Sequence, residues 1–113
     1  MTALSRKGAA VLYGYIGSMR TREGHRDEVI EILLGGADGL REAGCQLYAV
    51  GSDPADADVI WVSEIWDSRE LHDASLELPE TKAAIGRAMP LLTGEFTRQE
   101  LNVVGGLGVS MAG

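Results

Sequence analysis

Residues 59–66 read Val-Ile-Trp-Val-Ser-Glu-Ile-Trp, and this segment constrains the fold more than any other. β-Branched and aromatic side chains dominate it, which predicts a β-strand. Side chains alternate between the two faces of a strand. The two apolar sets are therefore Ile60, Val62 and Trp66 on one face and Val59, Trp61 and Ile65 on the other. A sheet that contains this strand needs apolar cover on both sides.

The rest of the chain supplies three more strands and a small number of helices. Strands are expected at 12–20, 45–51 and 96–104. Helices are expected from Thr21, as a possible cap, to about Ala43, from Ser68 to Leu78, and from Pro79 to Met89, where Pro90 stops the last one. This βαββαβ order predicts an α+β fold of the ferredoxin-like kind, with helices on one face of a four-stranded antiparallel sheet.

Helices on one face leave the second apolar face of residues 59–66 without cover. A homodimer supplies the missing layer most simply, because a second sheet can pack on the first. We expect a flexible arm at 1–10, one domain at 11–104 and a flexible Gly-rich tail at 105–113. A chain of 113 residues fits this single domain.

Composition excludes several classes of function. The formal net charge is −7, which disfavours nucleic acid and anionic membrane surfaces as partners. The single cysteine, Cys45, excludes an intrachain disulfide and a four-thiolate zinc site. No apolar stretch approaches the roughly 18 residues that span a bilayer, and the N-terminus lacks the pattern of a secretory signal. We therefore expect a soluble, cytoplasmic protein.

Candidate chemistry gathers around residues 59–66 and the helix that follows. Glu64 shares a strand face with Trp66, and His72 follows on the helix, so the three can border one space between sheet and helix. An aromatic wall beside titratable groups is typical of a ligand pocket. Each residue also has a plainer interpretation, as core, edge or solvent-exposed residue. The same holds for further candidate wall residues, Tyr13, Tyr15 and Met89.

Several motifs together resemble the antibiotic biosynthesis monooxygenase family. They are Gly44-Cys45-x-x-Tyr48, Ser52-Asp53-Pro54, Val59-x-x-x-x-Glu64-x-Trp66-x-Ser68, Leu71-His72-Asp73-Ala74-Ser75-Leu76, the Pro79 turn and Val104-Gly105-Gly106. The resemblance runs from about Tyr13 to Leu107. It implies two ferredoxin-like subunits joined sheet to sheet as a dimeric α/β barrel, and oxygen-dependent activity on quinols or polycyclic aromatic phenols without metal or flavin.

The resemblance also assigns positions. Trp66 matches the family's pocket tryptophan, and His72 stands where some members have a pocket tyrosine. Asparagines of some members fall at Gly17 and at Val62, so both positions lack the polar group that holds the oxyanion in those members, and Val62 is a candidate substrate contact. Haem-degrading relatives need a histidine near Ser75, so haem degradation is disfavoured. Two hypotheses follow: a cofactor-independent monooxygenase with Glu64 or His72 as base, or a non-catalytic dimer that binds a small ligand or fills its own pocket.

Overall fold

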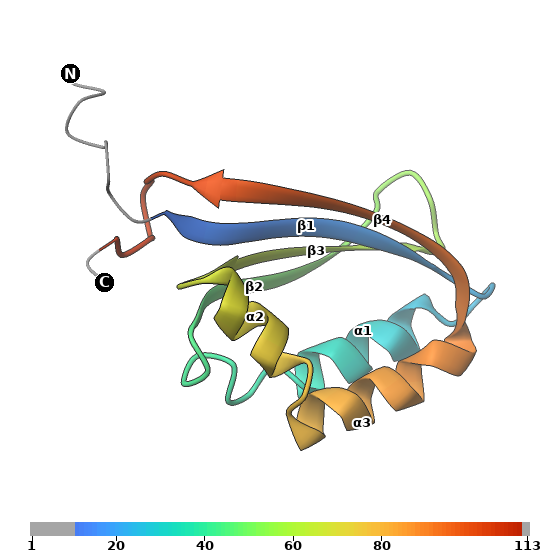
Figure 1. The fold of residues 1–113 in the computed structure, drawn as a ribbon. Coiled ribbons are helices and arrows are strands. Elements are labelled where there is room, and N and C mark those ends of the chain that lie inside the picture. The colour runs from blue at the N-terminus through green and yellow to red at the C-terminus, as the bar shows by residue number, and fades with distance from the viewer. Residues whose placement is uncertain (1–10, 112–113) are drawn as a thin grey trace.

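The computed structural model describes residues 11–111 as a four-stranded sheet with its helices on one face (Figure 1). The antiparallel strands lie in the order β2-β3-β1-β4. Their bounds are β1 Leu12–Thr21, β2 Cys45–Ser52, β3 Val59–Trp66 and β4 Leu92–Val103, and the helices are α1 Arg26–Gly35, α2 Arg69–Ser75 and α3 Pro79–Ala88. The predicted ferredoxin-like βαββαβ fold is confirmed. The arm predicted at 1–10 lies outside the described residues.

The first helix is shorter than the sequence pattern predicts. It ends at Gly35, and turns occupy the chain up to residue 44. Gly39 and Gly44 have φ values of +89° and +109°, a left-handed backbone that cannot continue an α-helix. Thr21 is not the cap either, because it is the last residue of β1 and only 1% exposed, whereas His25 holds the N-cap position. The prediction of one helix from Thr21 to Ala43 is therefore wrong.

The second half of the chain follows the local signals more closely. Ser68 caps α2, where its Oγ accepts a hydrogen bond of 3.1 Å from the backbone N–H of Leu71. Pro79 occupies the first turn of α3. A backbone N–H in this turn has no acceptor within the helix, so proline costs no hydrogen bond there. The helix stops at Ala88, and the 3₁₀ turn η2, Met89–Leu91, leads directly into β4. β4 thus begins at Leu92, four residues before the predicted start at Phe96.

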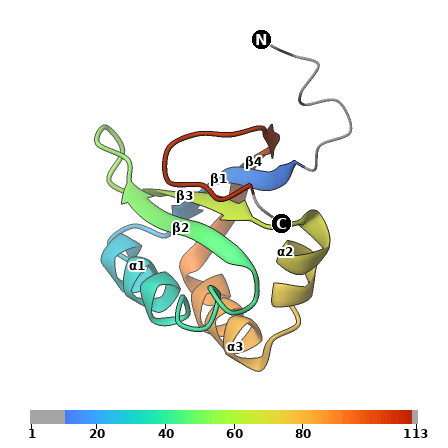
Figure 2. The ribbon, with the colours of Figure 1, turned by 90° about the vertical axis from the view of Figure 1, so that its left-hand side faces the viewer.

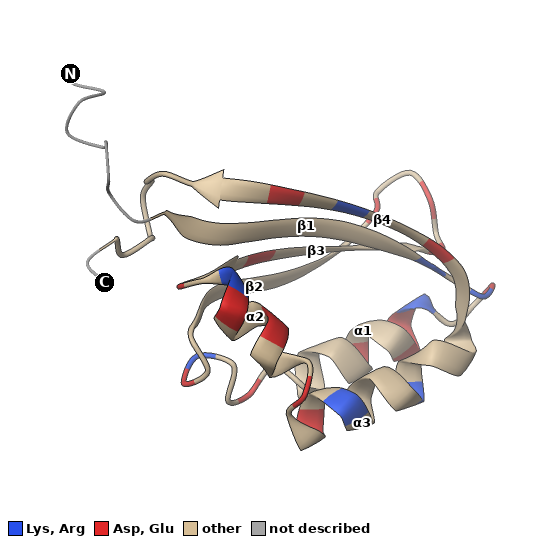
Figure 3. Ribbon diagram, in the orientation of Figure 1, with Lys and Arg blue, Asp and Glu red and all other residues tan. Residues whose placement is uncertain are grey.

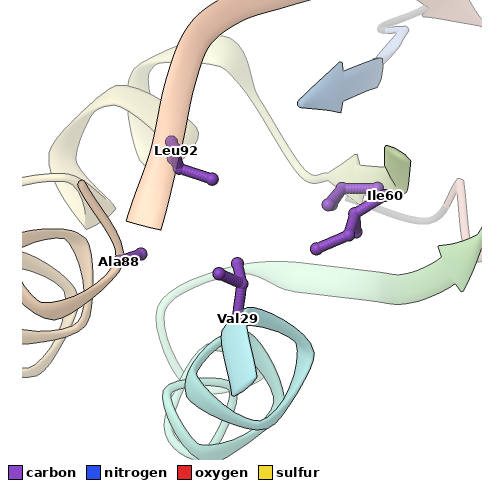
Figure 4. Packing of buried hydrophobic residues seen from close by; sticks show 5 residues of the cluster. Val29, Ile60, Ala88 and Leu92 are labelled. Atoms are coloured by element: carbon purple, nitrogen blue, oxygen red, sulfur yellow. The ribbon is translucent and has the colours of Figure 1, made fainter. Parts of the chain in front are cut away.

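Two buried clusters attach the helices to the sheet. One joins α1, α3 and the starts of β3 and β4 (Figure 4), and its members are Val29, Ile60, Val62, Ala88 and Leu92. The other lies at the opposite end of the sheet and contains Tyr13, Leu40, Cys45 and Trp66. The helix-facing side chains of β3 are thus in the core as predicted, with Ile60, Val62 and Trp66 at most 4% exposed.

The face of the sheet away from the helices is open and apolar. Ile16, Trp61, Leu47 and Leu101 are 37–44% exposed there, one or more from each strand. Residues 105–111 turn back across the end of this face toward β2 (Figure 2). Gln46 holds them through two side-chain hydrogen bonds of 2.8 Å, one to the carbonyl and one from the N–H of Ser110. Among residues 11–111, no helix is both long and apolar enough to cross a membrane.

Candidate functional site

A cavity of about 480 Å³ lies between the sheet and the helices α2 and α3. The sheet contributes mostly aromatic and apolar side chains to it, together with Glu64 and Arg98, whereas the side chains that α2 contributes are polar. Its lining includes Tyr15, Tyr48, Val62, Glu64 and Trp66 from the sheet and His72, Ala84 and Ile85 from the helices. A volume of this order is typical of small-molecule sites, and it shows that the protein's own side chains do not fill the pocket.

Glu64 brings a carboxylate into the lining of this cavity. It lies on the helix-facing side of β3, and the indole Nε1 of Trp66 donates a hydrogen bond of 2.8 Å to its Oε1. Burial raises the pKa of Glu64, while the Trp66 hydrogen bond and the nearby His72 partly oppose that rise. A carboxyl group with a raised pKa and one engaged oxygen can accept a proton from a bound ligand.

His72 closes the cavity from the side of α2. Its side chain is only 12% exposed, and its ring packs against three aromatic rings of the sheet. The ring centroids lie 4.9 Å from Tyr13, 5.7 Å from Tyr15 and 5.6 Å from Trp66. The Nδ1 atom lies 2.9 Å from the Oδ1 of Asp73, which fixes the ring orientation. His72 therefore forms part of the aromatic wall, with one nitrogen already engaged.

The strand register places two phenols beside Glu64. Tyr15 on β1 and Tyr48 on β2 are both its direct cross-strand partners, so the three side chains form one row on the helix-facing side. Burial raises the pKa of Tyr48 to about 12 and also raises that of Tyr15. Both hydroxyls are therefore protonated at neutral pH and can donate hydrogen bonds. Tyr48 was not among the predicted site residues, because its role depends on strand pairing.

The position of the Tyr15 side chain depends on Gly17. A Cβ atom at residue 17 would lie 2.8 Å from both the Oη and the Cε1 of Tyr15, and 3.0 Å from the carbonyl oxygen of Thr97. The phenol therefore lies over the glycine, in the space that any other side chain would occupy. Gly17 also lines the cavity, so the Tyr15 hydroxyl is at the cavity surface.

A charged cluster borders the cavity where β4 approaches the start of α2, and Figure 3 shows the basic and acidic bands of these elements. The Oε2 atom of Glu100 accepts a hydrogen bond of 2.6 Å from the hydroxyl of Tyr13. It also lies 3.1 Å from Arg98 and 3.5 Å from Arg69. These contacts, the Tyr13 hydrogen bond first, lower the pKa of Glu100, and burial together with Glu100 raises that of Tyr13 to about 12. Arg69 and Arg98 both line the cavity.

The structure thus brings most of the predicted site residues together. Glu64, Trp66, His72, Tyr15 and Val62 all line the cavity. Of the other two, Tyr13 packs behind the ring of His72, and Met89 is 52% exposed and outside the lining. Within residues 11–111, no group of three or more His, Cys, Asp or Glu side chains is placed to hold a metal ion.

Solved structures share this arrangement of sheet, helices and chain order. A protein from Chloroflexus aurantiacus named for antibiotic biosynthesis monooxygenases is 44% identical, with a TM-score of 0.79 over 88% of this chain and 99% of that one. A Caulobacter crescentus protein named for the same family is 18% identical, with a TM-score of 0.78 over 90% and 99% of the two chains. Rv0793 from Mycobacterium tuberculosis is 20% identical, with a TM-score of 0.72 over 85% and 98%. A search of curated proteins finds no match.

The fold is that of a ferredoxin-like α+β protein with a cavity between sheet and helices. The model of the antibiotic biosynthesis monooxygenase family matches residues 13–87. The chain therefore belongs to the antibiotic biosynthesis monooxygenase family, as its motifs indicate.

Proposed function

We propose that this protein is a cofactor-independent monooxygenase that acts on a quinol or polycyclic aromatic phenol with molecular oxygen. One observation carries the proposal: a partly buried carboxyl group, Glu64, in the lining of a cavity with aromatic walls. The aromatic and apolar side chains of the sheet can accept fused rings, and the carboxylate can remove the phenolic proton. Family membership is consistent with this chemistry.

The proposed reaction balances without a further reductant. Glu64 takes the proton of the phenol or enol, and the resulting anion is electron-rich enough to give an electron to oxygen. Combination at a ring carbon forms a C–O bond and a hydroperoxide. Loss of water then breaks the O–O bond and leaves a carbonyl. One oxygen atom enters the product. The other leaves as water with two hydrogens, which are the proton that Glu64 took and returns to the peroxide and the hydrogen of the oxidised carbon.

The neighbouring residues have separate tasks in this proposal. Trp66 orients Glu64, because its indole N–H holds one carboxylate oxygen and leaves the other available to substrate. The rings of His72 and Tyr15 provide apolar surface along which a planar substrate can lie. We assign the base to Glu64, whose carboxyl group lines the cavity with one oxygen held by Trp66. His72 is the second candidate, because its contact with Asp73 engages Nδ1 and leaves Nε2 to accept a proton.

Oxygen uptake by Glu64→Gln tests the proposal, with anthrone as substrate. The amide keeps the shape of the side chain but cannot accept the proton, so the rate is expected to fall at least about tenfold. Glu28→Gln, an exposed carboxylate on α1, is the matched control. Anaerobic titration with the same compound measures binding separately. Binding without uptake in the wild type would favour the alternative, a non-catalytic ligand-binding protein of the same fold.

We also propose that two copies pair through the open face of the sheet. The support is the row of half-exposed apolar side chains on that face, which includes Ile16, Trp61 and Leu101. Paired sheets would cover these side chains and form a dimeric α/β barrel, with one cavity in each subunit.

A further inference from the structure

The corner of the cavity next to Gly17 combines a neutral hydrogen-bond donor with a positive charge. The Tyr15 hydroxyl lies over Gly17, and Arg98 is the direct cross-strand partner of Gly17 on β4. The guanidinium carbon of Arg98 lies 5.9 Å from the centroid of the Tyr15 ring. The Tyr15 hydroxyl from β1 and the Arg98 guanidinium from β4 thus lie at one end of the cavity. They lie beside the cross-strand pair of Gly17 and Val62, which is next to the pair of Tyr15 and Glu64.

The donors at this corner have capacity left for a ligand. Tyr15 has no side-chain hydrogen bond to another residue in the described part of the chain, although ring contacts with His72 and Arg98 hold it in place. Arg98 has one carboxylate contact, with Glu100, and Glu100 is shared with Tyr13 and Arg69. A guanidinium has five N–H donors, so most of those of Arg98 are available.

The corner also lies away from the proton acceptor. The Glu64 carboxylate leans toward Trp66, one row along the sheet, whereas the Tyr15 hydroxyl leans toward Gly17 in the opposite direction. Alternate residues of a strand are about 7 Å apart, so side chains that lean in opposite directions along the sheet can meet different parts of one planar ligand.

We propose that Tyr15 and Arg98 form an anion-holding corner that selects aromatic substrates with a second, ionised oxygen group across the ring system from the hydroxyl deprotonated by Glu64. The ligand class is a hydroxylated aromatic acid or a second phenolate. The inference deepens the proposed function and rests on it for the role of Glu64. Gly17 is a positioning residue in this account, because only glycine leaves room for the Tyr15 hydroxyl.

Anaerobic binding of two matched probes tests the proposal without any turnover. The probes are 4-hydroxy-1-naphthoic acid, which is a carboxylate at neutral pH, and its neutral methyl ester, each followed by quenching of tryptophan fluorescence. The wild type is expected to bind the acid at least about tenfold more tightly than the ester. Arg98→Gln and Tyr15→Phe should each reduce that preference to about twofold or less, while affinity for the ester changes little.

Arg87→Gln is the control, because it removes the same charge from α3 at a residue outside the cavity lining. It should leave the preference for the acid intact. Gly17→Ala should lose the preference as Tyr15→Phe does, since the new Cβ displaces the hydroxyl. Equal affinity of the wild type for acid and ester would overturn the proposal, as would an unchanged preference in both Arg98→Gln and Tyr15→Phe. Because no oxygen is consumed, the outcome is independent of whether the protein is an oxygenase.

Discussion

Replacing Trp66 by phenylalanine tests whether the indole N–H controls the ionisation of Glu64. Phenylalanine keeps an aromatic ring in the wall of the cavity but removes the 2.8 Å hydrogen bond to the carboxylate. That hydrogen bond lowers the pKa of Glu64 against the larger effect of burial. Without it, the pKa of Glu64 rises further. A plot of oxygen uptake against pH then loses activity at a higher pH on its acid side, which is called the acid limb below.

The size of this effect follows from the strength of such a bond. A hydrogen bond to a charged group contributes about 1.5–3 kcal/mol. Even the lower figure reduces the ionised fraction of Glu64 about tenfold on the acid side of the profile, because about 1.4 kcal/mol corresponds to a factor of ten. Oxygen uptake by Trp66→Phe should therefore fall about tenfold at acidic pH and recover as the pH rises.

The chain offers a matched control on the opposite face of β3. Trp61 also donates its indole N–H to a carboxylate, at 2.9 Å from Asp53 Oδ2, but it does not line the cavity. Trp61→Phe should leave the acid limb in place. Glu64→Gln should abolish this dependence on pH. An acid limb at the same pH in Trp66→Phe and the wild type would refute this reasoning.

Three further predictions concern stability and assembly. Tyr13→Phe removes the hydrogen bond to Glu100 and should lower the urea concentration at the midpoint of unfolding, whereas an unchanged midpoint would show that the bond contributes nothing. Because burial raises the pKa of Glu64 in the folded state, its contribution to stability is present below its unfolded pKa and is lost as pH rises through the folded value. Urea unfolding of Glu64→Gln should therefore depend less on pH between 4 and 7 than that of the wild type; equal dependence would contradict the shift. Trp61→Glu places a charge on the open sheet face and should convert dimers to monomers in sedimentation velocity, whereas a wild-type monomer would contradict the pairing.

The sequence predicted the fold well where local signals and the hydrophobic pattern agree. Residues 59–66 form β3 with the predicted bounds, and Ser68 caps α2 as expected. The first helix was misjudged, because the apolar spacing continues past Gly35 although the left-handed backbone at Gly39 cannot. A periodic pattern does not show where a glycine turns the chain.

The site was only partly predictable for a related reason. The proximity of Glu64 and Trp66 follows from strand alternation alone. Tyr48 and Arg98 reach the cavity through strand pairing, and no local pattern reveals which residues become cross-strand partners. The role of Gly17 is visible only once the side chain of Tyr15 is seen to lie over it.

The central claim is that Glu64 initiates cofactor-independent oxygen chemistry within an aromatic cavity. Oxygen uptake by purified, metal-stripped protein with a panel of hydroquinones and anthrone, compared with Glu64→Gln and a boiled sample, tests it most directly. Uptake by the wild type is expected well above the boiled control, with a loss of at least about tenfold in Glu64→Gln. No uptake by the wild type across the panel, or equal uptake by both proteins, would contradict it.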